Sequence, residues 1–151
     1  MAQAGARKGA KHQTTSRRRN YKVGTFKYRF ELAARPEGPF EAIDALVDTG
    51  YVYTFVPGRI LRELGLQPVE RIRFTMANGE DEFRDSVEAL IRLDGRVRHT
   101  VCIFGEGKDQ NLLGAYALEG LGLAVDPVNK RLVPMPIMPA ATNCDLEGGA
   151  P

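Results

Sequence analysis

The sequence predicts a small all-β protein, a closed β-barrel with one or two short helices. Apolar and polar residues alternate with a period of two over several short segments, which is typical of half-buried strands. Turn-forming pairs, among them Asn78-Gly79 and Asp94-Gly95, separate these segments. The 151 residues suit one domain, and no apolar run is long enough for a membrane-spanning helix. Many short strands joined by turns favour a barrel.

The first half of the domain is expected to hold two strands and a helix. Over residues 26–32, large apolar side chains alternate with charged ones, which predicts a strand with one buried face. A turn-rich stretch, 35–39, separates it from a second strand over 40–47. Pro57 then opens a short helix and Gly65 closes it, because proline fits the first helical turn and glycine the residue after the last.

The second half is expected to consist of hairpins and one more helix. Alternation over 71–76 leads into Asn78-Gly79, and the returning strand, interrupted by charge near Asp81-Glu82, continues over 87–93. The remaining elements are a strand over 97–103, a polar loop over 105–110, a helix over 115–121 capped by Gly122, and strands over 123–125 and 131–133.

Charge and composition divide the chain into three parts, with a basic start and an end rich in proline and glycine. Nine of the 21 Lys and Arg lie in residues 1–30, together with none of the 19 Asp and Glu. We expect a disordered basic arm over 1–21, a folded domain over 22–134 and a flexible tail over 135–151. A basic arm can contact nucleic acid. It has no aromatic residue before Tyr21 that would stack on bases, so a solubilising extension is favoured.

Cysteine and histidine usage predicts neither a disulfide framework nor a metal site. Cys102 lies in an apolar run and is expected to be buried, and Cys144 lies in the polar tail. Two cysteines and no apolar secretory signal favour a reducing compartment, so we expect the protein in the cytoplasm. His12 and His99 have no metal-ligand spacing. No metal or other cofactor is expected.

The most distinctive motif is Asp48-Thr49-Gly50, which follows an apolar strand directly. Such a strand fixes a carboxylate on a rigid support, and Gly50 allows backbone N–H groups to approach it closely. Taken alone, the tripeptide is equally suited to a surface turn, and the turn would be favoured.

Four motifs in order resemble the retropepsin-like aspartic proteases, especially the small bacterial members. They are Leu46-Val47-Asp48-Thr49-Gly50, then Thr54-Phe55-Val56-Pro57 with a helix ending at Leu64-Gly65, then the Asn78-Gly79 hairpin, and last Leu112-Leu113-Gly114 with Leu118-Glu119 and Leu121-Gly122-Leu123. The resemblance covers nearly the whole folded segment. It implies the retropepsin type of barrel, working as a two-fold homodimer.

The resemblance also implies an aspartic endopeptidase that acts on a peptide or protein substrate. Two aspartates activate a water between them, and they share one proton because two carboxylates so close cannot both ionise. The chain has a single Asp-Thr-Gly, so the second Asp48 is implied to come from a second copy. Thr49 and Gly50 would support the loop, with Thr49 hydrogen-bonding across the two-fold axis.

The hairpin tip is implied to be the flap that covers the substrate, formed by Met76, Ala77, Asn78 and Gly79. A polar tip that contains glycine, followed by acidic residues, is free to open and close, and closure excludes water. An ordinary exposed hairpin is the alternative.

Three residues after the motif depart from the family. Most relatives have a small residue at the position of Tyr51, whose side chain would lie near the substrate cleft and could narrow it or shield the two carboxylates. Val52 and Tyr53 occupy positions where retroviral members carry acidic residues, so no substrate specificity follows. The alternative function is a catalytically inactive dimer that binds peptides or aids assembly, with Tyr51 blocking the cleft. The intact Asp48 favours the enzyme, because an inactive dimer does not need that carboxylate.

Overall fold

The computed structural model describes residues 25–76 and 78–135. The predicted arm, Ala77, Cys144 and nearly all of the predicted tail lie outside them. In the described part the elements are β1 (Lys27–Ala33), β2 (Glu41–Val47), β3 (Thr54–Pro57), α1 (Gly58–Glu63), β4 (Glu70–Thr75), β5 (Asp81–Leu93), β6 (Arg96–Gly105), β7 (Leu112–Leu113), α2 (Ala115–Gly120), β8 (Leu123–Asp126) and β9 (Arg131–Pro134). The predicted all-β class with two short helices is confirmed.

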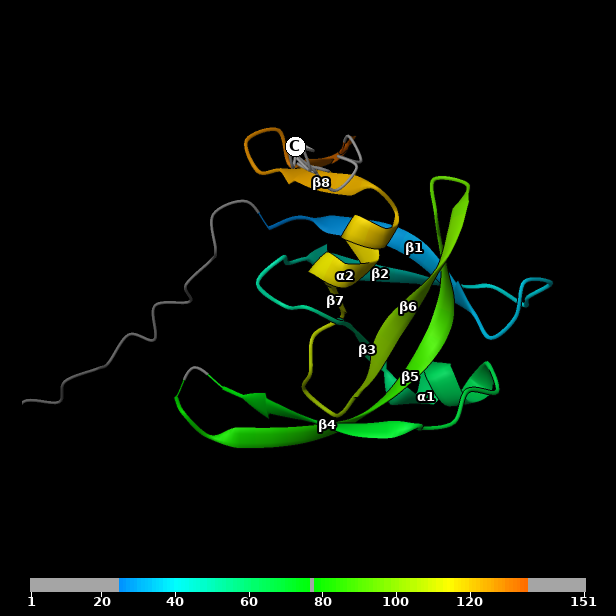
Figure 1. The fold of residues 1–151 in the computed structure, drawn as a ribbon, viewed down its shortest axis with the longest axis vertical. Helices are drawn as coiled ribbons and strands as arrows, with labels where there is room; N and C mark the ends of the chain where they lie inside the picture. The colour runs from blue at the N-terminus through cyan, green and yellow to red at the C-terminus, as the bar shows by residue number, and fades with distance from the viewer. Residues whose placement is uncertain (1–24, 77, 136–151) are drawn as a thin grey trace, which may run out of the picture.

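Seven strands form one sheet, in the order β1-β2-β7-β3-β6-β5-β4. β1 also pairs with β5, from Glu31–Arg92 to Ala33–Leu90, so six of the strands close into a ring and β4 lies outside it, paired with β5 (Figure 1). The predicted closed barrel is present as this ring of paired strands. β8 and β9 form a separate two-stranded sheet.

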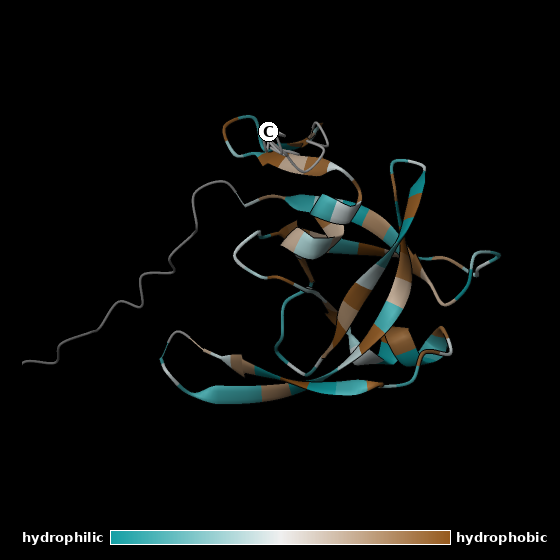
Figure 2. Ribbon diagram, viewed as in Figure 1, coloured by the Kyte–Doolittle hydropathy of each residue, from teal (hydrophilic) through white to brown (hydrophobic). Residues whose placement is uncertain are grey.

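The side chains that point into the ring form the main hydrophobic core. Alternating hydropathy is visible along β5 and β6 in Figure 2. Each helix adds a fully buried leucine, Leu61 from α1 and Leu118 from α2. Burial of such a side chain contributes about 1.5–3 kcal/mol, so both helices are held firmly against the ring. Strand residues of the core include Phe30, Leu32, Ile43, Ala45, Val47, Ile91, Leu93 and Leu113.

Cys102 is buried, as the sequence predicts, and burial raises the pKa of its thiol to about 12. The thiol is therefore protonated and unreactive near neutral pH. Within residues 25–76 and 78–135, no three His, Cys, Asp or Glu side chains gather where they could hold a metal ion. No helix in that same part of the chain has the length and apolar character needed to span a bilayer.

One expected interruption is wrong, and two short strands were not expected. β5 runs without a break from Asp81 to Leu93, because its ladder with β4 begins at Thr75–Asp81 and its charged side chains find partners. β3 and β7 have four and two residues. Strands this short carry too little alternation to be recognised. Pro57 ends β3 and caps α1, one residue before the helix proper.

Candidate active site

Asp48 directly follows β2 and is fixed by the strand next to it. β2 runs parallel to β7, with Leu46 opposite Leu112 and Val47 opposite Leu113. The backbone N–H of Asp48 donates to the carbonyl of Leu113 over 3.1 Å. Because Val47 and Leu113 are both buried, the backbone of Asp48 is anchored to the core and its half-buried side chain begins where the core ends.

The residues after Asp48 form a tight turn around its carboxylate. The N–H of Gly50 donates to Asp48 Oδ1 over 2.9 Å, and the N–H of Tyr51 donates to the Asp48 carbonyl over 3.2 Å. Thr49 and Gly50 are exposed at the outside of the turn. The first bond orients the carboxylate, and the exposed Thr49 is accessible to another molecule.

The start of α2 packs directly on this loop. The N–H groups of Ala115 and Tyr116 donate to the carbonyls of Tyr51 and Val52, each over 2.9 Å. These are the first N–H groups of the helix, which have no partner within it. A Cβ built on Gly114 would lie 2.5 Å from the carbonyl oxygen of Tyr53. Glycine is required here because any side chain would push the two segments apart.

Thr54 holds the other end of the loop. It is fully buried, and its Oγ1 accepts the N–H of Gly114 over 3.2 Å. β3 pairs with β7 at Phe55–Leu112, so β7 lies between β2 and β3. Both ends of the loop that carries Asp48 are therefore attached to one short strand. The sequence patterns predicted no role for Thr54. Its hydroxyl group stands at the start of an apolar run, and this is the feature that could have indicated a buried hydrogen bond.

Tyr51 packs sideways onto an aromatic cluster. Its ring lies 5.7 Å from that of Phe55 at 76°, and Phe55 lies 5.4 Å from Phe74 of β4 at 57°. Ile103 and Leu112 complete the buried part of this second hydrophobic cluster. The three rings connect the Asp48 loop to the β4/β5 hairpin.

The β4/β5 hairpin projects from the ring in Figure 1. Its turn falls at Asn78-Gly79, which confirms the predicted hairpin, and Gly79 has a φ of +84. The N–H of Glu80 donates to Asn78 Oδ1 over 3.0 Å, and the N–H of Gly79 donates to the Met76 carbonyl over 2.8 Å. Met76, Asn78 and Gly79 are exposed. The flap role stays a prediction.

Two large apolar side chains are exposed beside the loop. Val52 is 61% exposed and Tyr116 is 48% exposed, and the ring of Tyr116 lies 6.1 Å from that of Tyr53. The hydrogen bond from Tyr116 to Val52 keeps these side chains next to each other. We call Val52, Tyr53 and Tyr116 the loop patch.

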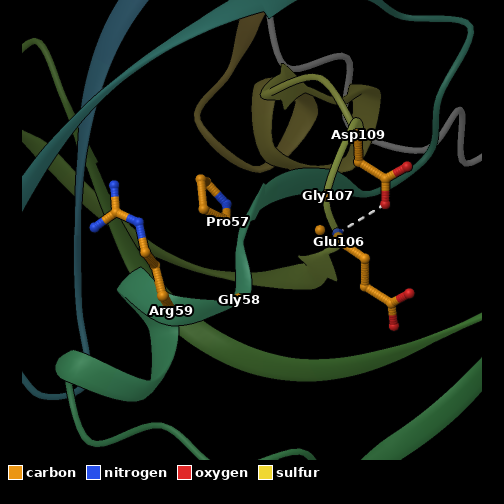
Figure 3. A pocket seen from close by; sticks show the side chains of 7 residues that line it. Pro57, Gly58, Arg59, Glu106, Gly107 and Asp109 are labelled. Atoms are coloured by element: carbon orange, nitrogen blue, oxygen red, sulfur yellow. Dashed lines mark hydrogen bonds between the residues drawn. The ribbon is translucent and has the colours of Figure 1, made fainter.

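A cavity of about 330 Å³ lies elsewhere, where β3 passes into α1 (Figure 3). Its lining does not include Asp48. The residues that line it are Pro57, Gly58, Arg59, Gly105, Glu106, Gly107 and Asp109. Asp109 belongs to the loop between β6 and β7, which leads to the strand that fixes Asp48.

Two solved protease structures are among those to which the chain is similar. One is the solution structure of Simian Foamy Virus (mac) protease, with 18% identity and a TM-score of 0.45 over 64% of this chain and 94% of that one. The other is the crystal structure of a retropepsin-like aspartic protease from Rickettsia conorii, with 22% identity and a TM-score of 0.46 over 70% of this chain and 90% of that one. No family model matches the sequence, and neither does any curated protein.

Proposed function

We propose that this protein is a retropepsin-like aspartic endopeptidase that works as a homodimer, with one Asp48 from each subunit. The observation that carries the proposal is the site around Asp48. A carboxylate stands at the end of a buried strand, its loop is bonded to β7 and α2, and Gly50 donates to Oδ1. An ordinary surface turn needs neither a glycine such as Gly114, where a Cβ would lie 2.5 Å from the carbonyl oxygen of Tyr53, nor a buried threonine to hold it.

The chemistry explains why a second subunit is required. A water attacks the peptide carbonyl carbon while one Asp48 carboxylate takes its proton, and the other Asp48 gives its proton to the carbonyl oxygen. Collapse of the tetrahedral intermediate breaks the C–N bond: the leaving amine takes the proton that the first Asp48 gained from water, and one hydroxyl of the intermediate returns a proton to the other Asp48. The sequence offers one Asp-Thr-Gly, so two copies related by a two-fold axis must supply the pair.

The outer surface of the loop supports this arrangement. Thr49 is exposed and next to Asp48, where a partner loop would lie. The loop patch adds apolar surface from this loop and from the first turn of α2, and contiguous exposed apolar surface can mark an association site. We therefore assign the loop patch to the dimer contact.

The position of Tyr51 supports an active enzyme rather than a blocked binding module. Its ring packs on the ring of Phe55, which also packs on the ring of Phe74. A ring fixed in that cluster forms part of the wall between the loop and the hairpin. An extended peptide would bind between this wall and the hairpin tip, and closure of the tip would exclude water from the scissile bond.

The decisive experiment compares the wild type with Asp48→Asn on a mixed peptide library from mildly acidic to neutral pH. We expect the wild type to cleave. The cleavage rate of the variant should be about a hundredfold to ten-thousandfold lower, the usual contribution of a general acid or base. Asp44→Asn, which changes an exposed carboxylate on the strand that leads to Asp48, is the matched control and should cleave normally. Peptide binding without cleavage by all three proteins would support the inactive module instead.

A further inference from the structure

The most enclosed ion pair among the described residues lies outside the site. The side chains of Arg84 and Asp109 are 13% and 19% exposed. In the Arg29–Asp44 pair, by contrast, more than half of each side chain is exposed. Arg84 Nε donates to Asp109 Oδ2 over 2.8 Å and Nη2 donates to Oδ1 over 3.3 Å. Nη2 also donates to Glu82, so the guanidinium is held from two sides.

The pair joins two segments that are distant in sequence. Arg84 lies on β5, in the part that forms the projecting hairpin with β4. Asp109 lies in the loop over 106–111, where its carboxylate also accepts the N–H of Glu106 over 2.9 Å (Figure 3). The N–H of Asp109 in turn donates to the Glu106 carbonyl over 2.8 Å. Asp109 therefore gives the loop its shape and binds the hairpin at the same time.

The loop continues into the strand that fixes Asp48. The carbonyl of Asn111 accepts the N–H of Leu46 over 3.0 Å, and its side-chain amide donates to the carbonyl of Asp44 over 3.3 Å. β7 begins at the next residue. A continuous set of bonds thus leads from the base of the hairpin through Asp109 to the strand before Asp48.

Besides continuing into the ring through β5, the hairpin contacts the body by apolar side chains. Ile72, opposite Arg84 in the ladder, and Phe74 pack on the cluster around Phe55. Apolar contact is not directional, so it allows the hairpin to rock. A bidentate guanidinium–carboxylate pair fixes both position and angle.

We propose that Arg84 and Asp109 are positioning residues whose ion pair clamps the base of the β4/β5 hairpin to the loop over 106–111. The clamp sets where the hairpin tip stands relative to Asp48, and this part of the inference rests on the proposed protease function. The attachment of the hairpin to the loop does not depend on it.

The clamp has a defined pH dependence. The two hydrogen bonds from Arg84 are the main reason that the pKa of Asp109 is held below its ordinary value of 3.8, and the N–H of Glu106 lowers it further. Glu82, Glu106 and Lys108 are the other charged groups near the pair, and Arg59 lies across the cavity. A lowered pKa means that the clamp is complete above the ordinary value and is lost as pH falls through the lowered one. It therefore stays closed at mildly acidic pH.

The test is hydrogen–deuterium exchange of the full chain at one pH, for wild type, Asp109→Asn and Arg84→Gln. Loss of a charge-assisted bond should speed exchange about tenfold or more in 72–84 and in 106–111, and leave the ring strand over 27–33 unchanged. Asp44→Asn removes an exposed pair between β1 and β2 and should leave both segments unchanged. Arg84→Lys keeps the charge without the fork and should give an intermediate rate.

Two results would overturn the clamp: unchanged exchange in both segments, or an equal increase over 27–33, which would mean general destabilisation.

With a cleaved peptide, Asp109→Asn should raise KM about tenfold and change kcat little, since the tip is displaced but Asp48 is not. An unchanged KM would overturn the positioning role. If the wild type cleaves nothing, the protease proposal fails while the exchange data still decide whether the clamp exists.

Discussion

Close contacts between segments restrict which residue type fits at several positions in this protein. Gly114 is the clearest case, because a Cβ there would meet three backbone atoms of Val52 and Tyr53 at 2.5–2.8 Å. Thr54 is chosen because its hydroxyl accepts the N–H of that same glycine in a fully buried place. Neither residue is part of the Asp-Thr-Gly motif, but both decide how rigidly the motif is held.

Gly114→Ala tests this at the residue scale. The added methyl forces the loop away from α2, and overpacking of this kind costs about 1–3 kcal/mol of unfolding free energy. Gly120→Ala is the control, because nothing lies within 4 Å of its Cβ and alanine favours a helix by up to about 1 kcal/mol. Urea unfolding of both variants measures the difference. Equal stability of the two proteins would contradict the packing argument.

At the scale of elements, the β4/β5 hairpin has two different faces. Ile72 and Phe74 face the aromatic cluster, while Phe83 lies on the other face with Arg71 near its ring, 5.9 Å from the centroid. β4 pairs with β5 but not with the rest of the ring, so the inner face is where the hairpin meets the body. β5 continues by backbone pairing into the ring from Ser86 onward, so it is the part of the hairpin before Ser86 whose position against the body depends on side chains.

Phe74→Ala tests which face carries that attachment. The variant loses the ring contact with Phe55, and a partly buried phenylalanine contributes about 2 kcal/mol. Phe83 lies on the outer face and is 46% exposed, so Phe83→Ala should lower the free energy of unfolding by less than about 1 kcal/mol. Thermal unfolding and cleavage of the hairpin by a nonspecific protease measure both. A larger effect of Phe83→Ala would reverse the assignment of the faces.

At the scale of the whole molecule, the proposed active centre depends on a second copy of the chain. One subunit contains one Asp48, and it carries exposed apolar side chains on the same loop, at Val52, and on the adjoining helix α2, at Tyr116. Association would bury the loop patch and bring the two carboxylates together. Stability and activity would then both depend on protein concentration.

Val52→Ser combined with Tyr116→Ser tests the dimer contact. Loss of two apolar side chains at the centre of an interface is expected to weaken association at least about tenfold. Val128→Ser, at the exposed turn between β8 and β9, should have no effect. Analytical ultracentrifugation over a concentration series measures the change. A wild-type protein that remains monomeric at all concentrations would refute the two-copy active centre.

Local sequence patterns determined most of the elements of this protein. Period-two alternation, Asn78-Gly79 and Asp94-Gly95 fixed the long strands and their turns, since both signals act over a few neighbouring residues. The Asp48-Thr49-Gly50 motif could be recognised in the same way. The charges near Asp81 predicted an interruption that the structure does not have. The ladder with β4 and nearby arginines stabilise these charges in a continuous strand.

Only the tertiary structure decided which distant residues meet. Gly114 and Thr54 are 60 positions apart, and Arg84 and Asp109 are 25 apart, so no local period connects either pair. Their contacts follow from closure of the ring and from the register of β7 between β2 and β3. Local patterns specify which residues form a strand, whereas long-range pairing specifies which strands are neighbours.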